Sequence, residues 1–210
     1  MPVVLNVNHL LDPVSGGGTA ERTFQMSRFL AKAGIDCRVL TTDLGLTPER
    51  RARLNGVTIT AAACLAKRFF VPRLSPAVIR ELVRQADVVH LMGHWTVLNA
   101  LVYWAARAAK KPYVVCPAGA LPLYGRSRWL KKLYNALIGR AIIANAAAWI
   151  AVTPDETAQF AAYGVDAGQI TVLPNGVDPD DFSAGDVATF RDRHGLGDAP
   201  LLLFMGRLNT

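Results

Sequence analysis

The sequence has 210 residues, of which 51% are hydrophobic and 19% are charged, and its formal net charge is +7. This length accommodates one domain, or one domain and part of another, and this composition excludes a generally disordered chain. Residues 1–11 are apolar but have no positively charged n-region, so they predict a first strand rather than a signal peptide. Three widely spaced cysteines form no C-x-x-C pair, which favours buried thiols in a reducing cytoplasm.

Short apolar runs of strand type alternate with helical patterns along most of the chain. Strands are predicted at 3–7, 37–42, 57–62, 88–91, 113–116, 149–152 and 170–173. Helices are predicted at 19–33, 76–85, 97–109, 127–147 and 155–163. The apolar stretch 133–152 changes from a helical to a strand pattern, so it predicts a helix and a strand rather than a membrane span. The alternation predicts an α/β fold, a Rossmann-like open parallel sheet with helices on both faces.

The last part of the chain differs in character. Residues 1–173 are predicted to form one Rossmann-like domain. Residues 174–197 contain five aspartates and one short helix near 187–194, and residues 174–199 are predicted to form an interdomain linker. An apolar strand at 200–205 then opens a second unit over 200–210, so we expect a truncated second domain.

The positive charge is concentrated in one segment. Between Val88 and Pro154 there are eight basic residues and no acidic residue, whereas the rest of the chain carries 15 basic and 16 acidic residues. Such a segment is either a solvated helix face or a surface that attracts phosphate, lipid headgroups or nucleic acid.

Three loops are candidates for chemistry. Gly16–Gly18 precede the first long helix, where free N–H groups favour an anion. A dinucleotide fold is disfavoured, because Glu21 occupies the position of the third fingerprint glycine and eight residues separate strand and glycines, although Asp43 does close the second strand. His90 to Trp95 follow a strand end, where ligands bind in open α/β sheets. No carboxylate or thiolate lies near these histidines in sequence, so a metal site is not expected.

The third loop, residues 117–122, contains two prolines and a glycine, Gly119. It leads into the basic start of the 127–147 helix. Positive charge there opposes the helix dipole, and a bound phosphate would offset the cost, which favours an anionic acceptor.

Together these pieces resemble the family 4 glycosyltransferases of the GT-B fold, in which two Rossmann-like domains face a cleft. The resemblance covers essentially the whole chain. Its most specific parts are the P-N-G-V-D-x-x-x-F segment from Pro174 to Phe182 and the F-x-G-R-L segment from Phe204 to Leu208. The weaker parts are Gly16–Gly18, Asp87–His90 and Pro117–Leu121.

The resemblance implies roles for particular residues. Gly17, Gly18 and Arg207 are expected at the donor diphosphate. Many members read H-x-H-G, with the second histidine touching the transferred sugar; here Met92 holds that position. Either His94 takes over as the catalytic residue or this subfamily works without it, and we favour His94. The expected acceptor-binding residues are His90, Trp95, Gly119, Tyr124, Arg126, Arg128, Lys131 and Lys132.

The implied reaction is transfer of a sugar from a nucleotide-diphosphate sugar, with retention, by a same-face mechanism without metal or cofactor. The expected partners are the nucleotide sugar, a sugar or lipid-linked acceptor and an anionic membrane surface contacted by the basic segment from the cytoplasmic side. Cell-surface polysaccharide or glycolipid synthesis would use such an enzyme, and this stretch alone is expected to be inactive.

Two alternatives belong to other classes. A nucleotide-sugar epimerase of the same fold would depend on carboxylates in the cleft, and the acid-free segment argues against it. A non-enzymatic anion- or nucleic-acid-binding module is disfavoured because the basic segment lacks interleaved exposed aromatics and a known module signature.

Overall fold

The computed structural model describes residues 1–67, 70–123, 127–181 and 185–204. The chain divides into two compact units, Met1–Gly176 and Val177–Thr210. Each unit is described by itself.

The first unit is built on an eight-stranded sheet with the order β4-β3-β2-β1-β5-β6-β7-β8. The strands are β1 Val3–Val7, β2 Asp36–Thr42, β3 Thr58–Ala66, β4 Val71–Arg73, β5 Val88–Met92, β6 Tyr113–Cys116, β7 Ala148–Ala151 and β8 Ile170–Val172. All neighbours pair in parallel except β3 and β4, which are antiparallel. The predicted α/β class with a Rossmann-like sheet is confirmed.

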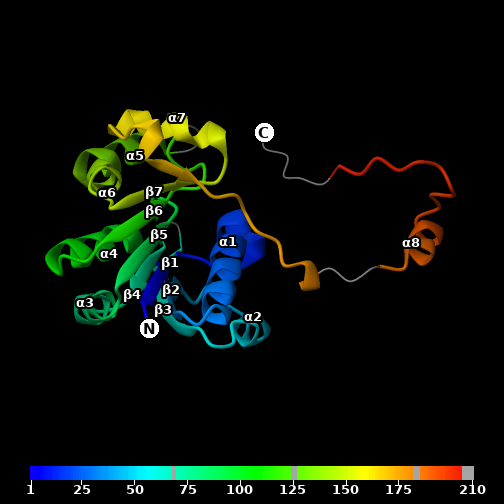
Figure 1. Ribbon diagram of the computed structural model, residues 1–210, viewed down its shortest axis with the longest axis horizontal. Coiled ribbons are helices and arrows are strands. Elements are labelled where there is room, and N and C mark those ends of the chain that lie inside the picture. The colour runs from blue at the N-terminus through cyan, green and yellow to red at the C-terminus, as the bar shows by residue number, and fades with distance from the viewer. Residues whose placement is uncertain (68–69, 124–126, 182–184, 205–210) are drawn as a thin grey trace. The chain divides into compact units, whose positions relative to one another are not determined.

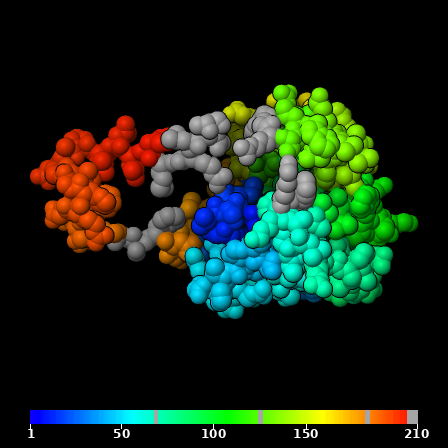
Figure 2. Space-filling view, turned by 180° about the vertical axis from the view of Figure 1, so that it is seen from behind, coloured from blue at the N-terminus to red at the C-terminus, as the bar shows by residue number. Residues whose placement is uncertain are grey.

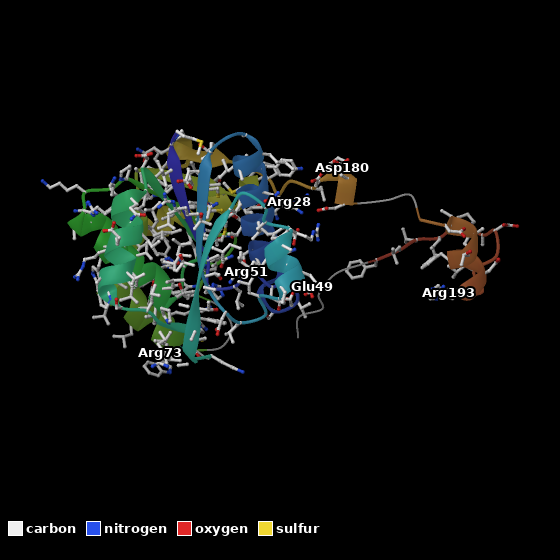
Figure 3. The ribbon with its side chains drawn as sticks, turned by 90° about the horizontal axis from the view of Figure 1, so that it is seen from below. Arg28, Glu49, Arg51, Arg73, Asp180 and Arg193 are labelled. Carbon is white, nitrogen blue, oxygen red and sulfur yellow. The ribbon has the colours of Figure 1, made fainter. Side chains whose placement is uncertain are left out.

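Helices cover both faces of this sheet (Figure 1). They are α1 Pro13–Lys32, α2 Pro48–Ala52, α3 Pro76–Gln85, α4 Val97–Ala108, α5 Arg128–Tyr134, the π-helix η1 Asn135–Gly139, α6 Arg140–Ala144 and α7 Thr157–Phe160, with short 3-10 turns η2 Pro154–Glu156, η3 Ala161–Tyr163 and η4 Ala167–Gln169. In Figure 3, Arg28 of α1 lies on the same side of the sheet as Glu49 and Arg51 of α2.

The two faces of the central strands carry different chemistry. Leu5, Val89 and Leu91 belong to the main hydrophobic core, which α3 and α4 complete. Their alternate neighbours Asn6 and His90 are also buried, but they lie on the α1 side. Successive strand residues point to opposite faces, so an apolar core is backed by a buried polar layer.

The predicted helix over 127–147 is real but is not uniform. It runs from Arg128 to Ala144 and contains the π-helical segment Asn135–Gly139 at its centre. The strand β7 follows at Ala148, as the change of pattern predicted. Within the part of the chain that the structure describes, no helix combines the length and apolarity needed to cross a bilayer.

The second unit contains the 3-10 turn η5 Pro179–Asp181 and the helix α8 Val187–Arg193. The strand predicted at 200–205 was wrong for residues 201–204, which have no regular structure. A strand needs a neighbour to receive its backbone hydrogen bonds, and the described residues of this unit contain no other strand.

Candidate functional site

The strand order reverses direction between β1 and β5, where the sheet is built outward to both sides. In open parallel sheets the crevice at such a switch point, beyond the carboxyl ends of the strands, is where ligands bind. The segments that leave this edge are residues 8–12 after β1, residues 93–96 after β5 and residues 117–123 after β6. The candidate segments 90–95 and 117–122 of the sequence therefore reach this edge of the sheet, whereas Gly16–Gly18 lie within α1.

The glycine segment does not form the loop that the sequence predicted but a break inside α1. Asp12 caps the helix by accepting hydrogen bonds from Val14 N and Ser15 N, and Pro13 occupies the first turn. Gly17 then adopts φ 58° and ψ −143°, which interrupts the helix. A second run of helix begins at Gly18, and the first N–H groups of such a run have no acceptor within it.

The three glycines differ in what they require. A Cβ at Gly16 would lie 2.6 Å from Ala20 Cβ, so close packing demands glycine there. Gly17 needs glycine because of its backbone conformation. A Cβ at Gly18 would meet no described atom within 4 Å, so the fold itself leaves that position open.

Asn8 fixes the second run of α1 to the end of β1. Its Nδ2 donates to Thr19 O at 3.0 Å and to Thr23 Oγ1 at 2.9 Å, and the residue is fully buried. Among the described residues its Oδ1 finds no hydrogen-bond partner. Asn8 was not a candidate in the sequence, where an Asn after a strand is a weak signal.

His90 is held as a neutral ring with a defined tautomer. Asn6 Nδ2 donates to Ser27 Oγ at 3.0 Å and to Cys37 Sγ at 3.4 Å, so Asn6 Oδ1 faces His90 Nδ1 at 3.1 Å. The Nδ1 atom must therefore carry the proton, which leaves a lone pair on Nε2. Burial, assisted by the nearby charge of Arg22, lowers the pKa of His90 to about 4. Nε2 is buried and has no hydrogen-bond partner in the described structure.

Arg22 is a buried cation of α1 that sequence reasoning did not select. It is 6% exposed, and its Nη1 donates to Asn175 Oδ1 at 3.0 Å. Its Nε and Nη2 atoms have no hydrogen-bond partner among the described residues. Burial raises the pKa of the neighbouring Cys116 thiol to about 11, although Arg22 opposes that shift. Arg22 thus brings unsatisfied donors and a positive charge to the α1 face of the sheet.

His94 lies in a closed aromatic setting. It is 1% exposed, and the rings of Trp95, Tyr134 and Tyr163 stand around it at centroid distances of 4.4, 5.6 and 5.6 Å. Its Nε2 lies 3.0 Å from Asn135 Oδ1, and burial lowers its pKa to about 4. Contact with a substrate would require these neighbours to move, so the catalytic role of His94 stays a prediction.

The loop after β6 is tied to the same aromatic group. Trp95 Nε1 donates to Ala120 O, and Tyr163 OH donates to Leu121 O at 3.2 Å. Gly119 has φ 76°, which favours glycine. Lys131 Nζ stands 5.4 Å from the centre of the Trp95 ring. The structure therefore brings Trp95, the Gly119 loop and Lys131 together.

The remaining predicted acceptor residues are placed differently. Arg128 and Lys132 are exposed on α5, whereas His90 lies apart in the polar layer under α1. Tyr124, Arg126 and the donor candidate Arg207 lie outside the described residues, as do Phe182 and residues 205–208 of the linker motifs.

The two acidic residues weighed against the dinucleotide fingerprint, Glu21 and Asp43, both have partners within the fold. Glu21 pairs with Arg50 at 2.6 Å, and Arg50 stacks 3.4 Å above the centre of the Phe24 ring. Asp43 Oδ1 accepts from Cys64 N at 3.1 Å. Both acids therefore have structural roles where α1, α2 and β3 meet the sheet.

Comparison with known proteins assigns the family. Residues 17–176 match the sequence profile of the glycosyl transferase 4-like domain. The chain belongs to this family. It is 29% identical to the D-inositol 3-phosphate glycosyltransferase of Geodermatophilus obscurus and 28% identical to that of Frankia alni, in each case over 91% of this chain. These alignments cover 46% and 51% of the two relatives, so the chain spans about half the length of the curated relatives it matches.

Solved structures share the fold of this glycosyltransferase-family chain. Anabaena HepE in complex with UDP-glucose superposes with a TM-score of 0.67 over 94% of this chain and 51% of HepE, at 15% identity. The S. aureus MnaA–UDP co-structure gives a TM-score of 0.54 over 94% of this chain and 56% of MnaA, at 14% identity. At these identities the likeness concerns the fold alone.

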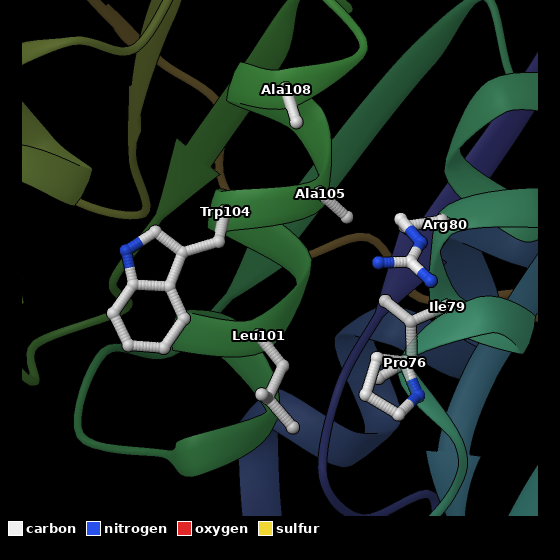
Figure 4. A pocket seen from close by; sticks show the side chains of 7 residues that line it. All are labelled: Pro76, Ile79, Arg80, Leu101, Trp104, Ala105 and Ala108. Atoms are coloured by element: carbon white, nitrogen blue, oxygen red, sulfur yellow. The ribbon is translucent and has the colours of Figure 1, made fainter.

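A separate pocket lies away from the switch-point crevice. It has a volume of about 380 Å³ between α3 and α4, on the sheet face opposite α1, and is lined by Pro76, Ile79, Arg80, Leu101, Trp104, Ala105 and Ala108 (Figure 4). None of the predicted site residues contributes to it. The candidate site of this family member therefore remains the edge where β1, β5 and β6 end.

Proposed function

We propose that this chain is the acceptor-side domain of a retaining glycosyltransferase, which moves a sugar from a nucleotide-diphosphate sugar to an acceptor hydroxyl. Membership of the glycosyl transferase 4-like family supports the reaction class. The observation that carries the proposal is the break of α1 at Gly17, because it starts a second, 15-residue helical run whose Thr19 O accepts from Asn8 just after β1. Helix N-termini favour phosphate groups through their free N–H groups and dipole.

The donor end of the site needs positive partial charge. When the bond between the sugar and the diphosphate breaks, the diphosphate takes both electrons, and donors already in place stabilise it. The N–H groups from Gly18 onward, together with Arg207, are the proposed partners. This arrangement calls for no metal or organic cofactor.

The proposed displacement takes place on one face of the sugar. The anomeric C–O bond to phosphate breaks, the acceptor oxygen bonds to the same carbon from the same side, and its proton passes to the departing phosphate oxygen. A buried neutral His94 would contribute by hydrogen bonding to the transferred sugar, not by carrying charge. No nucleophilic side chain is required.

The acceptor is proposed to bind by the loops after β5 and β6, at Trp95, Gly119 and Lys131, with Arg128 and Lys132 close in sequence. Two relatives are named D-inositol 3-phosphate glycosyltransferase, and D-inositol 3-phosphate carries negative charge. An anionic sugar or lipid-linked acceptor therefore suits the acid-free segment. Synthesis of a cell-surface polysaccharide or glycolipid at the cytoplasmic face of a membrane is the proposed setting.

The test uses the full-length protein with UDP-glucose and other UDP-sugars, offered with and without D-inositol 3-phosphate. We expect acceptor-dependent release of UDP and a product whose anomeric configuration, read by NMR, matches that of the donor. The 210-residue chain alone should give no transfer. Inversion at the anomeric carbon would overturn the mechanism, and epimerisation of the UDP-sugar without acceptor would instead support the epimerase alternative.

Gly18→Ala is the most direct test of the proposed donor diphosphate site. Its Cβ enters space that is empty in the fold but is proposed to hold the diphosphate. We expect kcat/KM to fall at least tenfold, which corresponds to about 1.4 kcal/mol, with an unchanged melting temperature. Gly168→Ala, on a surface turn away from the switch point, is the matched control. Equal activity of the two variants would remove Gly18 from the donor site.

A further inference from the structure

We infer that one face of the α5–η1 helix is a docking surface for an anionic lipid bilayer. This docking face consists of an apolar row, Trp129, Leu133 and Leu137, and a basic row, Arg128, Lys132 and Arg140. The inference rests on the proposed function in one respect, because it identifies the membrane partner of the basic segment. Its test measures lipid binding and requires no catalytic turnover.

The apolar row is exposed although its residues are large. Trp129, Leu133 and Leu137 are 68%, 48% and 74% exposed, and they follow one another at intervals of four residues. Trp129 and Leu133 of α5 lie above one another on the same face of the helix, and the exposed Leu137 follows them in the π-helical segment. Single exposed apolar residues are ordinary, but a continuous row of three marks a surface that meets an apolar partner.

The basic row accompanies the apolar row: Arg128 and Lys132 precede Trp129 and Leu133 by one residue each, and Arg140 follows Leu137 by three. Arg128, Lys132 and Arg140 are all exposed. Arg140 Nη1 donates to Ala162 O at 3.2 Å, so its guanidinium is held beside η3 while the residue stays exposed. No acidic residue occurs between Val88 and Pro154, so this segment offers no carboxylate of its own to neutralise these charges.

The opposite side of the helix is fixed in the core, so the docking face is already formed. Ile138, Ile142 and Ile143 are buried. Tyr113 OH donates to Ile142 O at 2.8 Å, and Tyr134 OH donates to Thr96 O at 3.1 Å. The helix therefore needs no reorganisation to present its outer rows.

The apolar surface continues from this row into a groove. The groove has a volume of about 370 Å³ and is lined by Trp95, Val97, Ser127, Leu130, Lys131, Leu133, Tyr134 and Leu137. Leu133 and Leu137 belong both to the exposed row and to the groove wall. In Figure 2 the yellow-green atoms of this segment form a continuous surface at one end of the first unit.

Charge and shape together favour a lipid surface over a protein partner. A helix with an apolar row bearing Trp and Leu beside a basic row lies in the plane of a membrane interface, with its apolar side chains among the acyl chains. Trp is enriched at that depth, and basic side chains attract anionic headgroups. An acidic protein would neutralise the basic row but would not by itself account for Trp129 and Leu137 at its side.

The experiment is flotation of the 210-residue chain with vesicles of phosphatidylcholine alone or with about 30 mol% phosphatidylglycerol, whose negative surface potential attracts basic side chains. We expect binding to the anionic vesicles that weakens strongly between roughly 0.05 and 0.5 M salt, since surface charges are screened. The triple variant Trp129→Ser/Leu133→Ser/Leu137→Ser should lose at least tenfold in partitioning. Trp104→Ser, which removes another exposed tryptophan on α4, is the matched control and should bind as the unmodified chain does.

The charge arm uses Arg128→Gln/Lys132→Gln against Arg107→Gln/Lys110→Gln. Both pairs are exposed and lie in the same basic segment, but only the first pair is on the docking face. We expect partitioning onto the anionic vesicles to fall roughly tenfold or more in the first double variant and to change little in the second. Equal losses for the two pairs would mean that only net charge matters, and the docking face would be wrong.

Insertion is tested by tryptophan quenching with brominated phosphatidylglycerol. We expect quenching that is largely lost in Trp129→Phe and retained in Trp104→Phe. Failure of the unmodified chain to float at low salt, or equal quenching in both variants, would overturn the inference. A full-length protein that binds lipid but transfers no sugar would leave this inference standing and remove the proposed function.

Discussion

The ring of His90 and the amide of Asn6 form a hydrogen-bonded pair across the switch point of the sheet, with Nδ1 and Oδ1 3.1 Å apart. The two residues are register partners on β5 and β1, the strands between which the sheet order reverses. Because Asn6 is oriented by Ser27 and Cys37, His90 must donate from Nδ1. His94 has the opposite tautomer, since its Nε2 faces Asn135 Oδ1 and Asn135 Nδ2 donates to Tyr163 OH.

Acid should weaken the fold through these buried histidines. Burial lowers the pKa of His9, His90 and His94 to about 4 each, from 6.5. Between these values the unfolded chain binds more protons than the folded chain, so stability falls as pH drops from about 6.5 towards 4. One such histidine accounts for about 2 kcal/mol of stability lost between pH 7 and pH 5.

The measurement is urea unfolding at pH 7 and pH 5. The free energy of unfolding should differ less between pH 7 and pH 5 in His90→Gln and in His94→Gln, by about 2 kcal/mol each. This holds even if a variant is less stable at both pH values. His194→Gln, on the exposed end of α8, is the control and should leave the difference unchanged. A difference that none of the buried-histidine variants alters would contradict the assignment.

Gly17→Ala should destabilise the protein, whereas Gly18→Ala should not. At φ 58° and ψ −143° an alanine is strained, at a cost of about 1–3 kcal/mol. Gly18 has neither a positive φ nor a described neighbour near its Cβ. Chemical unfolding of the two variants at pH 7 separates the effects, and similar losses in both would mean that α1 is not broken at Gly17.

Much of the fold could be predicted because its central elements carry their own signals. The helix 76–85 was predicted with its observed bounds, since Ser75 and Pro76 form a cap and a first turn and the apolar residues repeat with helical spacing. The central strands are continuous apolar runs, as both-face burial requires. The start of α1 was missed because three glycines outweighed the Asp12-Pro13 start signal.

The elements that were missed or cut short lie at one edge of the sheet. β4 has three residues, one of which is Pro72, and it pairs in an antiparallel direction with β3 across an irregularity near Cys64. So short a strand has no periodicity to detect. The five-residue helix α2 had a usable signal in Thr47-Pro48, whose Thr47 side chain accepts from Arg50 N.

The sequence predicted the place of two candidate segments but not the state of their side chains. His90–Trp95 and residues 117–122 lie at the ends of β5 and β6, because parallel strands end at a common edge, whereas Gly16–Gly18 lie inside α1. The enclosure of His94 depends on Asn135 and Tyr163, which are 41 and 69 positions away in the sequence and lie in the π-helical segment and in η3. Arg22 looked like an ordinary helix cation, because nothing near it in sequence reveals that Asn175 lies beside it.

The contact between Arg22 and Asn175 should appear as an energetic coupling. It joins α1 to the Pro-Asn-Gly segment at the end of the first unit. In a double-mutant cycle with Arg22→Met and Asn175→Ala, we expect a coupling of about 1 kcal/mol in the free energy of unfolding. The pair Arg84→Met and Asn175→Ala is the additive control, because in the described structure Arg84 pairs with Glu81 of its own helix. Additivity in the first cycle would contradict the hydrogen bond.

Gly139→Ala tests whether the π-helical segment exists to hold His94. A Cβ there would lie 2.3 Å from Asn135 Oδ1 and 3.0 Å from His94 Nε2, so it would compete with the hydrogen bond between them. We expect a loss of about 1–3 kcal/mol from overpacking, and a rise in the exchange rate of the His94 ring proton followed by NMR. Gly168→Ala, where the nearest atom would be 3.6 Å away, is the matched control. If Gly139→Ala weakened the fold but left the ring proton protected, the segment would serve packing alone. The glycine would then have no part in orienting the histidine, and the predicted catalytic role of His94 would lose its positioning partner.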